Sequence, residues 1–247
     1  MDAVSKAELA EQLRGLGIRA GGTLMMHASL RKLGPVEGGA AGLIEAAREA
    51  VGDDGALLMV LSAVEDRPFD ARSSPVDTED MGMLAEVFRT FPEVEVNDHA
   101  ADRFAALGRE VRGLLEPMPL HDYHGPGSVL ERLTERGGQV LRLGANIDTI
   151  TLTHYAEYLA EVPDKRRVRR RYVRADLGEQ WIESLDDSEG IVEWSGGDYF
   201  PQIFLDYLAT GQVRTAPVGR CSAELLEARD FVEFAVRWMN EHLGRRR

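Results

Sequence analysis

The sequence predicts an α/β protein: one compact domain of three layers, with a central, mostly parallel or mixed sheet flanked by helices and a hairpin and helices near the C-terminus. Short apolar segments with strand character alternate with amphipathic helical segments. The 247 residues are 44% hydrophobic, enough for a large core, and show no linker, internal repeat or low-complexity tract. Residues 1–247 are therefore expected to form a single domain.

The first half of the chain reads as alternating helices and strands. Leu9, Leu13 and Leu16 recur at helical spacing between Ser5 and Gly17, two residues typical of helix ends. The expected elements that follow are strands over 23–27 and 56–61 and helices over 40–51 and 81–90. The polar loop over 66–78 holds two prolines and is long enough to suggest a functional role.

The second half continues the alternation and ends in a hairpin and helices. A helix over 128–136 and a buried strand over 139–143 lead through a loop into a helix from about 149 to 160. Two hairpin strands over 169–174 and 179–184 and helices over 199–210 and 223–243 are expected to follow. A strand end that opens into a helix start is where α/β proteins tend to bind ligands, which directs attention to residues 144–149.

Acidic residues outnumber basic ones, 42 against 29, for a formal net charge of -13. This excess argues against a nucleic acid as partner and suits a polycationic ligand, although solubility alone is the commoner reason. Lys165 to Arg174 reverses the trend with a dense run of bases. A solvated loop or edge strand and an anion site both remain open for this run.

Cys221 is the only cysteine, so no internal disulfide can form. Residues 1–22 lack the apolar region of a signal peptide, and no stretch approaches the 18 apolar residues of a membrane helix. We therefore expect a cytoplasmic protein that does not associate with membranes. A monomer and a homodimer are equally compatible with the sequence.

The segment from His27 to Gly34, continued by Gly38 and Gly39, is the first candidate binding site. Backbone N–H groups at a helix start, with Ser29, Arg31 and Lys32 nearby, could hold a pyrophosphate or a pantetheine arm. The spacing is neither that of a P-loop nor that of a dinucleotide fingerprint. The glycines could equally serve only a tight turn and helix packing.

His154 and Glu157 form the second candidate site. Three residues apart on a helix, they lie on one face, so the carboxylate can bind one ring nitrogen and leave the other as a base. A purely structural pair is the commoner outcome for such spacing. A zinc site would need two histidines four residues apart around a glutamate, which is absent, so no metal is expected.

The third candidate is the acidic loop that contains Glu65, Asp66, Asp70 and Asp77, with His99 in a further loop. Carboxylates here would suit ammonium groups, but they are equally ordinary as solvated loop residues.

Together these segments resemble the aminoglycoside 3-N-acetyltransferases, a family of antibiotic N-acetyltransferases distinct from the GNAT fold. The matching pieces keep the family's order between about residues 5 and 163. They are Met26-His-Ala-Ser-Leu-Arg-Lys-Leu-Gly34 with Gly38-Gly39, Phe69-Asp70 with Ser74-Pro75-Val76, Asp80-Met-Gly82 with Phe88-Arg89, His99 with Phe104-Ala-Ala-Leu-Gly108, Gly125-Pro-Gly-Ser128, and Leu143-Gly144 through Thr149, Thr151, His154 and Ala156-Glu157. The chain departs from the family pattern at Ala100, Arg103, Val129 and Asn146, positions near the acceptor and coenzyme sites.

The resemblance implies transfer of acetyl from acetyl-coenzyme A, as co-substrate, to the 3-amino group of 2-deoxystreptamine aminoglycosides, and hence antibiotic resistance. His154 would be the general base and Glu157 would orient it. The coenzyme contacts it implies are Ser29, Leu30, Arg31, Lys32, Leu33, Gly34, Val36, Gly38, Gly39 and Phe104, and the acceptor contacts are Asp66, Asp70, His99, Asp148 and Glu193. Cys221 lies outside the matching segments, so direct transfer is expected. Acetylation of another amine, and non-catalytic binding of drug or coenzyme, stay open as alternatives.

Overall fold

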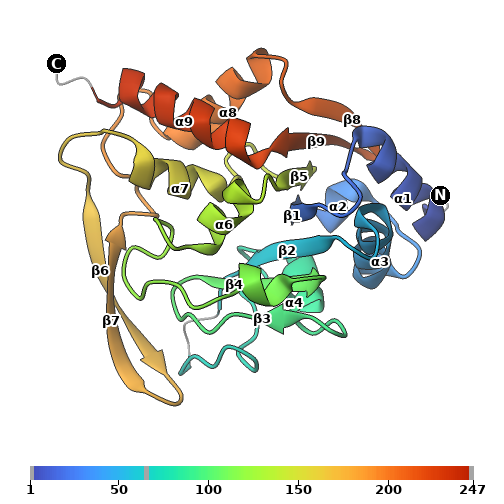
Figure 1. The fold of residues 1–247 in the computed structure, drawn as a ribbon, viewed down its shortest axis with the longest axis horizontal. Coiled ribbons are helices and arrows are strands. Elements are labelled where there is room, and N and C mark those ends of the chain that lie inside the picture. The colour runs from blue at the N-terminus through green and yellow to red at the C-terminus, as the bar shows by residue number, and fades with distance from the viewer. Residues whose placement is uncertain (1–2, 64–66, 245–247) are drawn as a thin grey trace.

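A mixed seven-stranded sheet forms the centre of the computed structural model, which describes residues 3–63 and 67–244 (Figure 1). The strand order is β3-β4-β2-β1-β5-β9-β8. β1 pairs in parallel with β2 and β5, and the remaining neighbours in this sheet pair antiparallel. The strands are β1 (Thr23–Ala28), β2 (Ala56–Leu61), β3 (Glu95–Val96), β4 (Arg103–Gly108), β5 (Gln139–Leu143), β8 (Arg214–Val218) and β9 (Cys221–Glu227). The predicted α/β fold class with a mixed central sheet is confirmed.

Helices cover both faces of this sheet and bury two separate cores. One face carries α1 (Lys6–Leu16), α2 (Leu30–Leu33), α3 (Gly39–Val51) and α4 (Met83–Arg89). The other carries α5 (Val111–Leu114), α6 (Val129–Glu135), α7 (Leu152–Leu159), α8 (Tyr199–Ala209) and α9 (Ala228–His242). In β1, Leu24 and Met26 belong to the first core and Met25 to the second, as the alternation of strand side chains requires.

The C-terminal third differs from the expectation of one helix over 223–243. Cys221–Glu227 forms β9, and the helix α9 begins only at Ala228. The segment is rich in the good helix formers Ala, Glu and Leu, but it pairs along β5 and buries Leu225 and Leu226 in the two cores. Tertiary pairing therefore outweighs local helix propensity. β8, which was not predicted, adds the edge strand and carries Pro217, as an edge position tolerates.

The predicted hairpin is confirmed as a separate two-stranded sheet of β6 (Arg167–Arg174) and β7 (Gly178–Leu185), which stands beside the main body (Figure 1). Acidic partners accompany much of its basic run: Arg167 pairs with Asp122 and Glu183, Arg170 with Asp187, and Arg171 with Glu179. These ion pairs balance the local charge and favour the edge-strand interpretation over an anion site.

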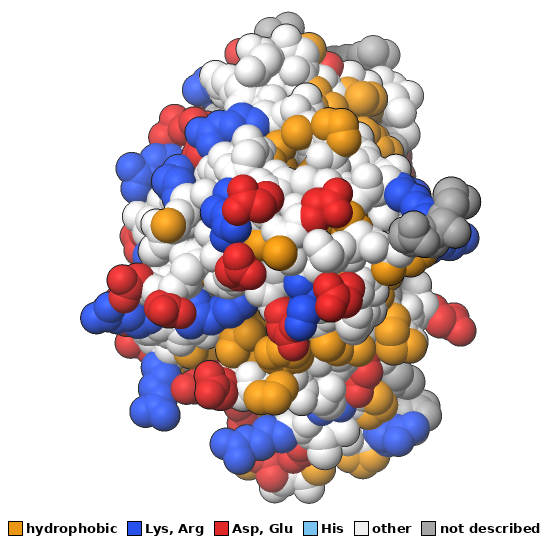
Figure 2. Space-filling model, turned by 90° about the vertical axis from the view of Figure 1, so that its right-hand side faces the viewer, with side chains coloured by type: hydrophobic (Ala, Val, Ile, Leu, Met, Phe, Trp, Pro, Cys, Tyr) orange, Lys and Arg blue, Asp and Glu red, His pale blue; other side chains and the backbone are white. Residues whose placement is uncertain are grey.

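The face of the molecule that carries α1 and α3 shows intermingled basic and acidic side chains with hydrophobic ones between them (Figure 2). Lys6 pairs there with Glu45 and Arg14 with Glu49, joining the two helices. The acidic excess is therefore not concentrated on this face. Within the described residues, no helix has the length and apolar character needed to cross a membrane.

Ser128 starts α6 and connects it to the segment before it. Its buried hydroxyl accepts a hydrogen bond from the Glu131 N–H at 3.1 Å and donates to the His124 carbonyl at 3.3 Å. The Glu131 carboxylate in turn accepts from the Gly127 N–H at 2.7 Å. This reciprocal pattern resembles a capping box and fixes the chain that carries His124.

We expect Ser128→Ala to lower the free energy of unfolding by about 1–2 kcal/mol, because the cap is lost and buried backbone groups lose their partner. Urea denaturation followed by circular dichroism measures the change. Ser5→Ala, which removes the less buried cap of α1, is the control and should cost less. An equal or smaller loss for Ser128→Ala would contradict this account.

Candidate active site

His154 lies in the first turns of α7, and Glu157 holds its ring from one turn further along the same helix. The Nδ1 atom is 2.9 Å from Oε2 of Glu157. The Glu157 side chain is 1% exposed and that of His154 17%. Because a carboxylate only accepts hydrogen bonds, Nδ1 donates, and Nε2 is left as the nitrogen able to take up a proton. The helix begins at Leu152, three residues later than expected, and still places both side chains on one face.

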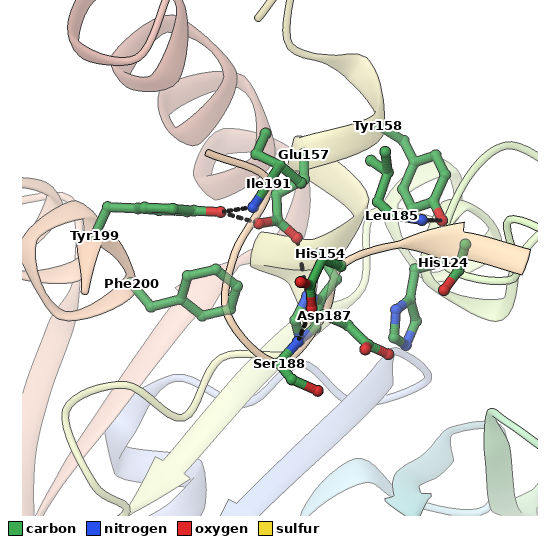
Figure 3. Close-up of polar contacts among 12 residues, drawn as sticks. His124, His154, Glu157, Tyr158, Leu185, Asp187, Ser188, Ile191, Tyr199 and Phe200 are labelled. Atoms are coloured by element: carbon green, nitrogen blue, oxygen red, sulfur yellow. Dashed lines mark hydrogen bonds and ion pairs between the residues drawn. The ribbon is translucent and has the colours of Figure 1, made fainter. Parts of the chain in front are cut away.

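Tyr199, the first residue of α8, holds the other oxygen of Glu157 (Figure 3). Its hydroxyl donates to Oε1 of Glu157 and accepts from the Ile191 N–H at 2.9 Å. Burial, with the adjacent Glu157 carboxylate, raises the pKa of Tyr199, so the hydroxyl keeps its proton and remains a donor. A chain of three hydrogen bonds therefore runs from the Ile191 backbone to the imidazole of His154.

Aromatic rings enclose the imidazole on two sides. The His124 ring lies parallel to it, with 4.7 Å between centroids and 9° between planes, and the Phe200 ring lies 4.9 Å away at 59°. Asp187 lies close to both histidines in Figure 3. Burial alone would raise the pKa of Asp187, but its hydrogen bonds from Arg170 and Tyr123 lower it overall, so it remains a carboxylate.

Two cavities meet at His154. The first, about 780 Å³, lies between the end of β2, the loops around residues 68 and 101, and β6. The second, about 600 Å³, lies between the 146–149 loop, the 187–190 segment and the start of α8. His154 lines both, together with Asp80, Met81, Asp187 and Ser188. The free imidazole nitrogen is thus positioned where two bound molecules could meet.

The predicted coenzyme loop lies beside the second cavity rather than inside either. Ser29 caps the four-residue helix α2, which the sequence did not predict, and Lys32 donates to the Asn146 side chain at 3.3 Å. Asn146 lines the second cavity. The remaining predicted coenzyme contacts of this loop differ in exposure: Arg31, Gly38 and Gly39 are exposed, Leu30 and Gly34 are half-buried, and Leu33 and Val36 are buried. Phe104, in contrast, is 0% exposed within the core, which leaves no side-chain surface for a ligand.

The predicted acceptor residues are scattered. Asp148 is exposed and lines the second cavity. Asp70 caps the turn at Ser73, and its neighbour Phe69 lines the first cavity. His99 is buried, where its ring contacts the Asp102 N–H and the Leu120 carbonyl. Glu193 is exposed and lines neither cavity. Asp66, with Glu65, lies outside the described residues.

Several residues of the site were missed by the sequence reasoning. Asp187 and Tyr199 lie beyond residue 175, where the family pattern is weak, and their roles depend on long-range packing. His124 and Asp102 carried a signal: His124 directly precedes the matching segment that begins at Gly125, and Asp102 lies between His99 and Phe104. Within the described residues no cluster of three metal-binding side chains occurs.

An imidazole held by a carboxylate beside two cavities is an arrangement typical of a general base in an enzyme active site. The aminoglycoside 3-N-acetyltransferase family model matches residues 25–240. Aminoglycoside N(3)-acetyltransferase III of Serratia marcescens is 36% identical, over 96% of this chain and 97% of that protein. The chain belongs to this family of acetyltransferases, and the resemblance seen in the sequence is confirmed.

Solved structures agree in fold over nearly the whole chain. The structure described as "AAC-IIIb binary with CoASH" matches with a TM-score of 0.94 at 32% identity, covering 100% of both chains. "AAC-VIa bound to Sisomicin" matches with a TM-score of 0.91 at 32% identity, covering 99% of this chain and 100% of that one. The departures from the family pattern at Ala100, Arg103, Val129 and Asn146 therefore leave the overall architecture unchanged.

We expect Tyr199→Phe to lower kcat for acetyl transfer about tenfold while changing the KM for coenzyme little. The variant removes one hydrogen bond to Glu157 and leaves the Ile191 N–H unpaired, a loss on the order of 1–2 kcal/mol. Steady-state kinetics measure the effect. Tyr207→Phe is the control, because that buried hydroxyl has no hydrogen-bond partner among the described residues. An unchanged kcat in Tyr199→Phe would contradict the orienting role.

Proposed function

We propose that this protein transfers the acetyl group of acetyl-coenzyme A to the 3-amino group of 2-deoxystreptamine aminoglycosides and thereby confers resistance to them. The observation that carries the proposal is the imidazole of His154, which lines both cavities and whose Nδ1 donates to Glu157, so that Nε2 is the nitrogen able to accept a proton. Membership of the family supplies the donor and the acceptor class.

The reaction is a direct transfer in a ternary complex. The amine attacks the thioester in its neutral form, because only then is its lone pair free, and His154 Nε2 removes one N–H proton from the attacking nitrogen as the C–N bond forms. The tetrahedral intermediate collapses as the C–S bond breaks, and the imidazolium returns the proton to the departing thiolate. Glu157 stabilises the charged imidazole between these two events, as the acid does in a hydrolase triad, but no enzyme nucleophile takes part.

Coenzyme A lies along the loop Ser29 to Gly39 and extends its pantetheine arm past Asn146 toward His154. Three observations support this placement: the loop borders the second cavity through the Lys32 contact with Asn146, its lysine and Arg31 are exposed for phosphate groups, and AAC-IIIb, of the same fold, is described with CoASH. Acetyl-coenzyme A enters as co-substrate, and no metal takes part in the step.

The aminoglycoside presents its ammonium groups to carboxylates around His154. Asp80 and Asp187 line both cavities beside the imidazole, and Asp148, Glu189 and Asp198 line the second. Such a concentration of negative charge favours a polycationic sugar and raises its local concentration. AAC-VIa, a relative of the same fold, is described as bound to sisomicin. We also place the protein in the cytoplasm, in keeping with its single free cysteine.

We expect His154→Ala to reduce turnover at least about a hundredfold while coenzyme binding persists, because only the general base is lost. Release of the coenzyme thiol measures turnover, and calorimetric titration with coenzyme A measures binding. The exposed Arg31→Ala is a contrasting variant and should weaken coenzyme binding more than the turnover at saturation. Retained turnover in His154→Ala would refute the mechanism.

A panel of amines tests the acceptor. Thiol release that depends on 2-deoxystreptamine drugs supports the proposal, release only with other amines replaces the acceptor, and binding of drug or coenzyme without release would mean a non-catalytic protein. Mass spectrometry of the product locates the acetyl group on the sugar.

We expect Cys221→Ser to leave turnover within about twofold of the unchanged protein. Burial raises the pKa of the Cys221 thiol, which disfavours the thiolate that a covalent carrier would need, and Cys221 lines neither cavity. Steady-state kinetics and intact-protein mass spectrometry with acetyl-coenzyme A check this. A large loss of turnover, or an acetylated Cys221, would overturn direct transfer.

A further inference from the structure

We propose that His124, held by Asp102, is a positioning residue that acts through His154: its ring is the platform that fixes the plane of the catalytic imidazole, and its positive charge favours the unprotonated form of that imidazole. The inference rests on the proposed function, because it assigns His154 as the base. Neither residue contributes an atom to the reaction.

The platform follows from the stacking geometry. The bond to Glu157 holds one nitrogen of His154 but leaves the ring able to turn about that bond. The parallel His124 ring at 4.7 Å removes this freedom on one face, and the tilted Phe200 ring restricts the other. The orientation of the His154 ring is therefore set by its bond to Glu157 and by stacking, and only the Glu157 bond was evident from sequence.

His124 itself is firmly held. Its carbonyl accepts from the Ser128 hydroxyl, and its Nε2 atom lies 3.2 Å from Oδ1 of Asp102. Asp102 is anchored in turn, because its N–H donates to the His99 ring and its carbonyl accepts from the Asn97 side chain at 3.2 Å. His99 therefore helps to hold the backbone of Asp102, and through Asp102 the ring of His124, in place.

The charge follows from burial of the pair. The Asp102 side chain is 2% exposed, and its Oδ2 atom has no hydrogen-bond partner among the described residues. A buried carboxylate with a single partner favours the charged form of that partner. Burial works against a charged His124, but the surrounding carboxylates, Asp102 first and then Asp187 and Glu157, together outweigh it and raise the pKa of His124. Asp102 and His124 therefore form a buried ion pair.

The His124 ring lies 4.7 Å from the His154 ring, and two positive charges at this distance repel, so a charged His124 opposes a second positive charge on the stack. The other charged or titratable groups around the pair and His154 are Glu157 from α7, Tyr199 from α8, Tyr123 against the His124 ring, His99 beside Asp102, Arg170 from the hairpin with Asp187 from the segment after it, and Asp80 from the segment before α4. Because none of these groups is altered when only the pair is changed, variants of the pair isolate its contribution.

The test compares variants that separate charge from stacking. Asp102→Asn removes the ion pair and keeps both rings, so the acid limb of kcat should move up by about 0.5–1 pH unit while the plateau kcat at high pH stays within twofold. The double variant Asp102→Asn/His124→Phe keeps a ring without charge and should show the same shift. Asp102→Asn/His124→Ala removes the platform and should also lower the plateau about tenfold.

The control is Ile44→Val in α3, a buried change in the other core, which should lower thermal stability without moving the pH profile. Circular dichroism confirms that each variant is folded. An unchanged profile and plateau in all three variants, or losses that only follow the folded fraction, would overturn the inference. Lack of thiol release by the unchanged protein with every amine would instead contradict the proposed function, and this inference with it.

Discussion

The hydrogen bond between His154 and the buried Glu157 is the interaction on which the proposed chemistry depends. An imidazole is useful as a base only if the correct nitrogen carries its lone pair and points at the substrate, and a carboxylate that accepts from Nδ1 fulfils the first condition. A carboxylate that is 1% exposed must itself be satisfied, and Tyr199 supplies that second donor. The orientation of one ring therefore involves the packing of α7 against α8.

The sheet explains why residues so far apart in sequence meet at this ring. β1, β2 and β5 run parallel, so the segments that follow them emerge at one edge, and α7 is reached from the end of β5 through the loop that carries Asp148. The hairpin β6–β7 contributes Arg170 and leads to Asp187, while the bend before α6 contributes His124. The residues around the two cavities thus come from different loops between strands and helices, and the sheet holds those loops at fixed distances from one another.

Local signals were sufficient for the elements near the matched motifs. The strands at 56–61 and 139–143 have the predicted bounds, and the i, i+3 spacing of His154 and Glu157 was enough to predict their contact. Two kinds of information were not local. Cys221–Glu227 has helix-forming residues and became a strand because β5 offered an unpaired edge, and the contact of Tyr199 with Glu157 spans 42 residues of sequence. Phe104 lies in a matching motif but is 0% exposed, so its side chain packs in the core.

The position of β9 has a consequence for biosynthesis. β5 pairs with β1 on one side and with β9 on the other, so until residues 221–227 have left the ribosome β5 is an open edge. α7, which carries His154, also packs against α9, residues 228–242. The nascent protein consequently cannot complete the layer around the His154 ring until residues 228–242 have been synthesised, and its apolar edge is exposed to misassociation during that interval.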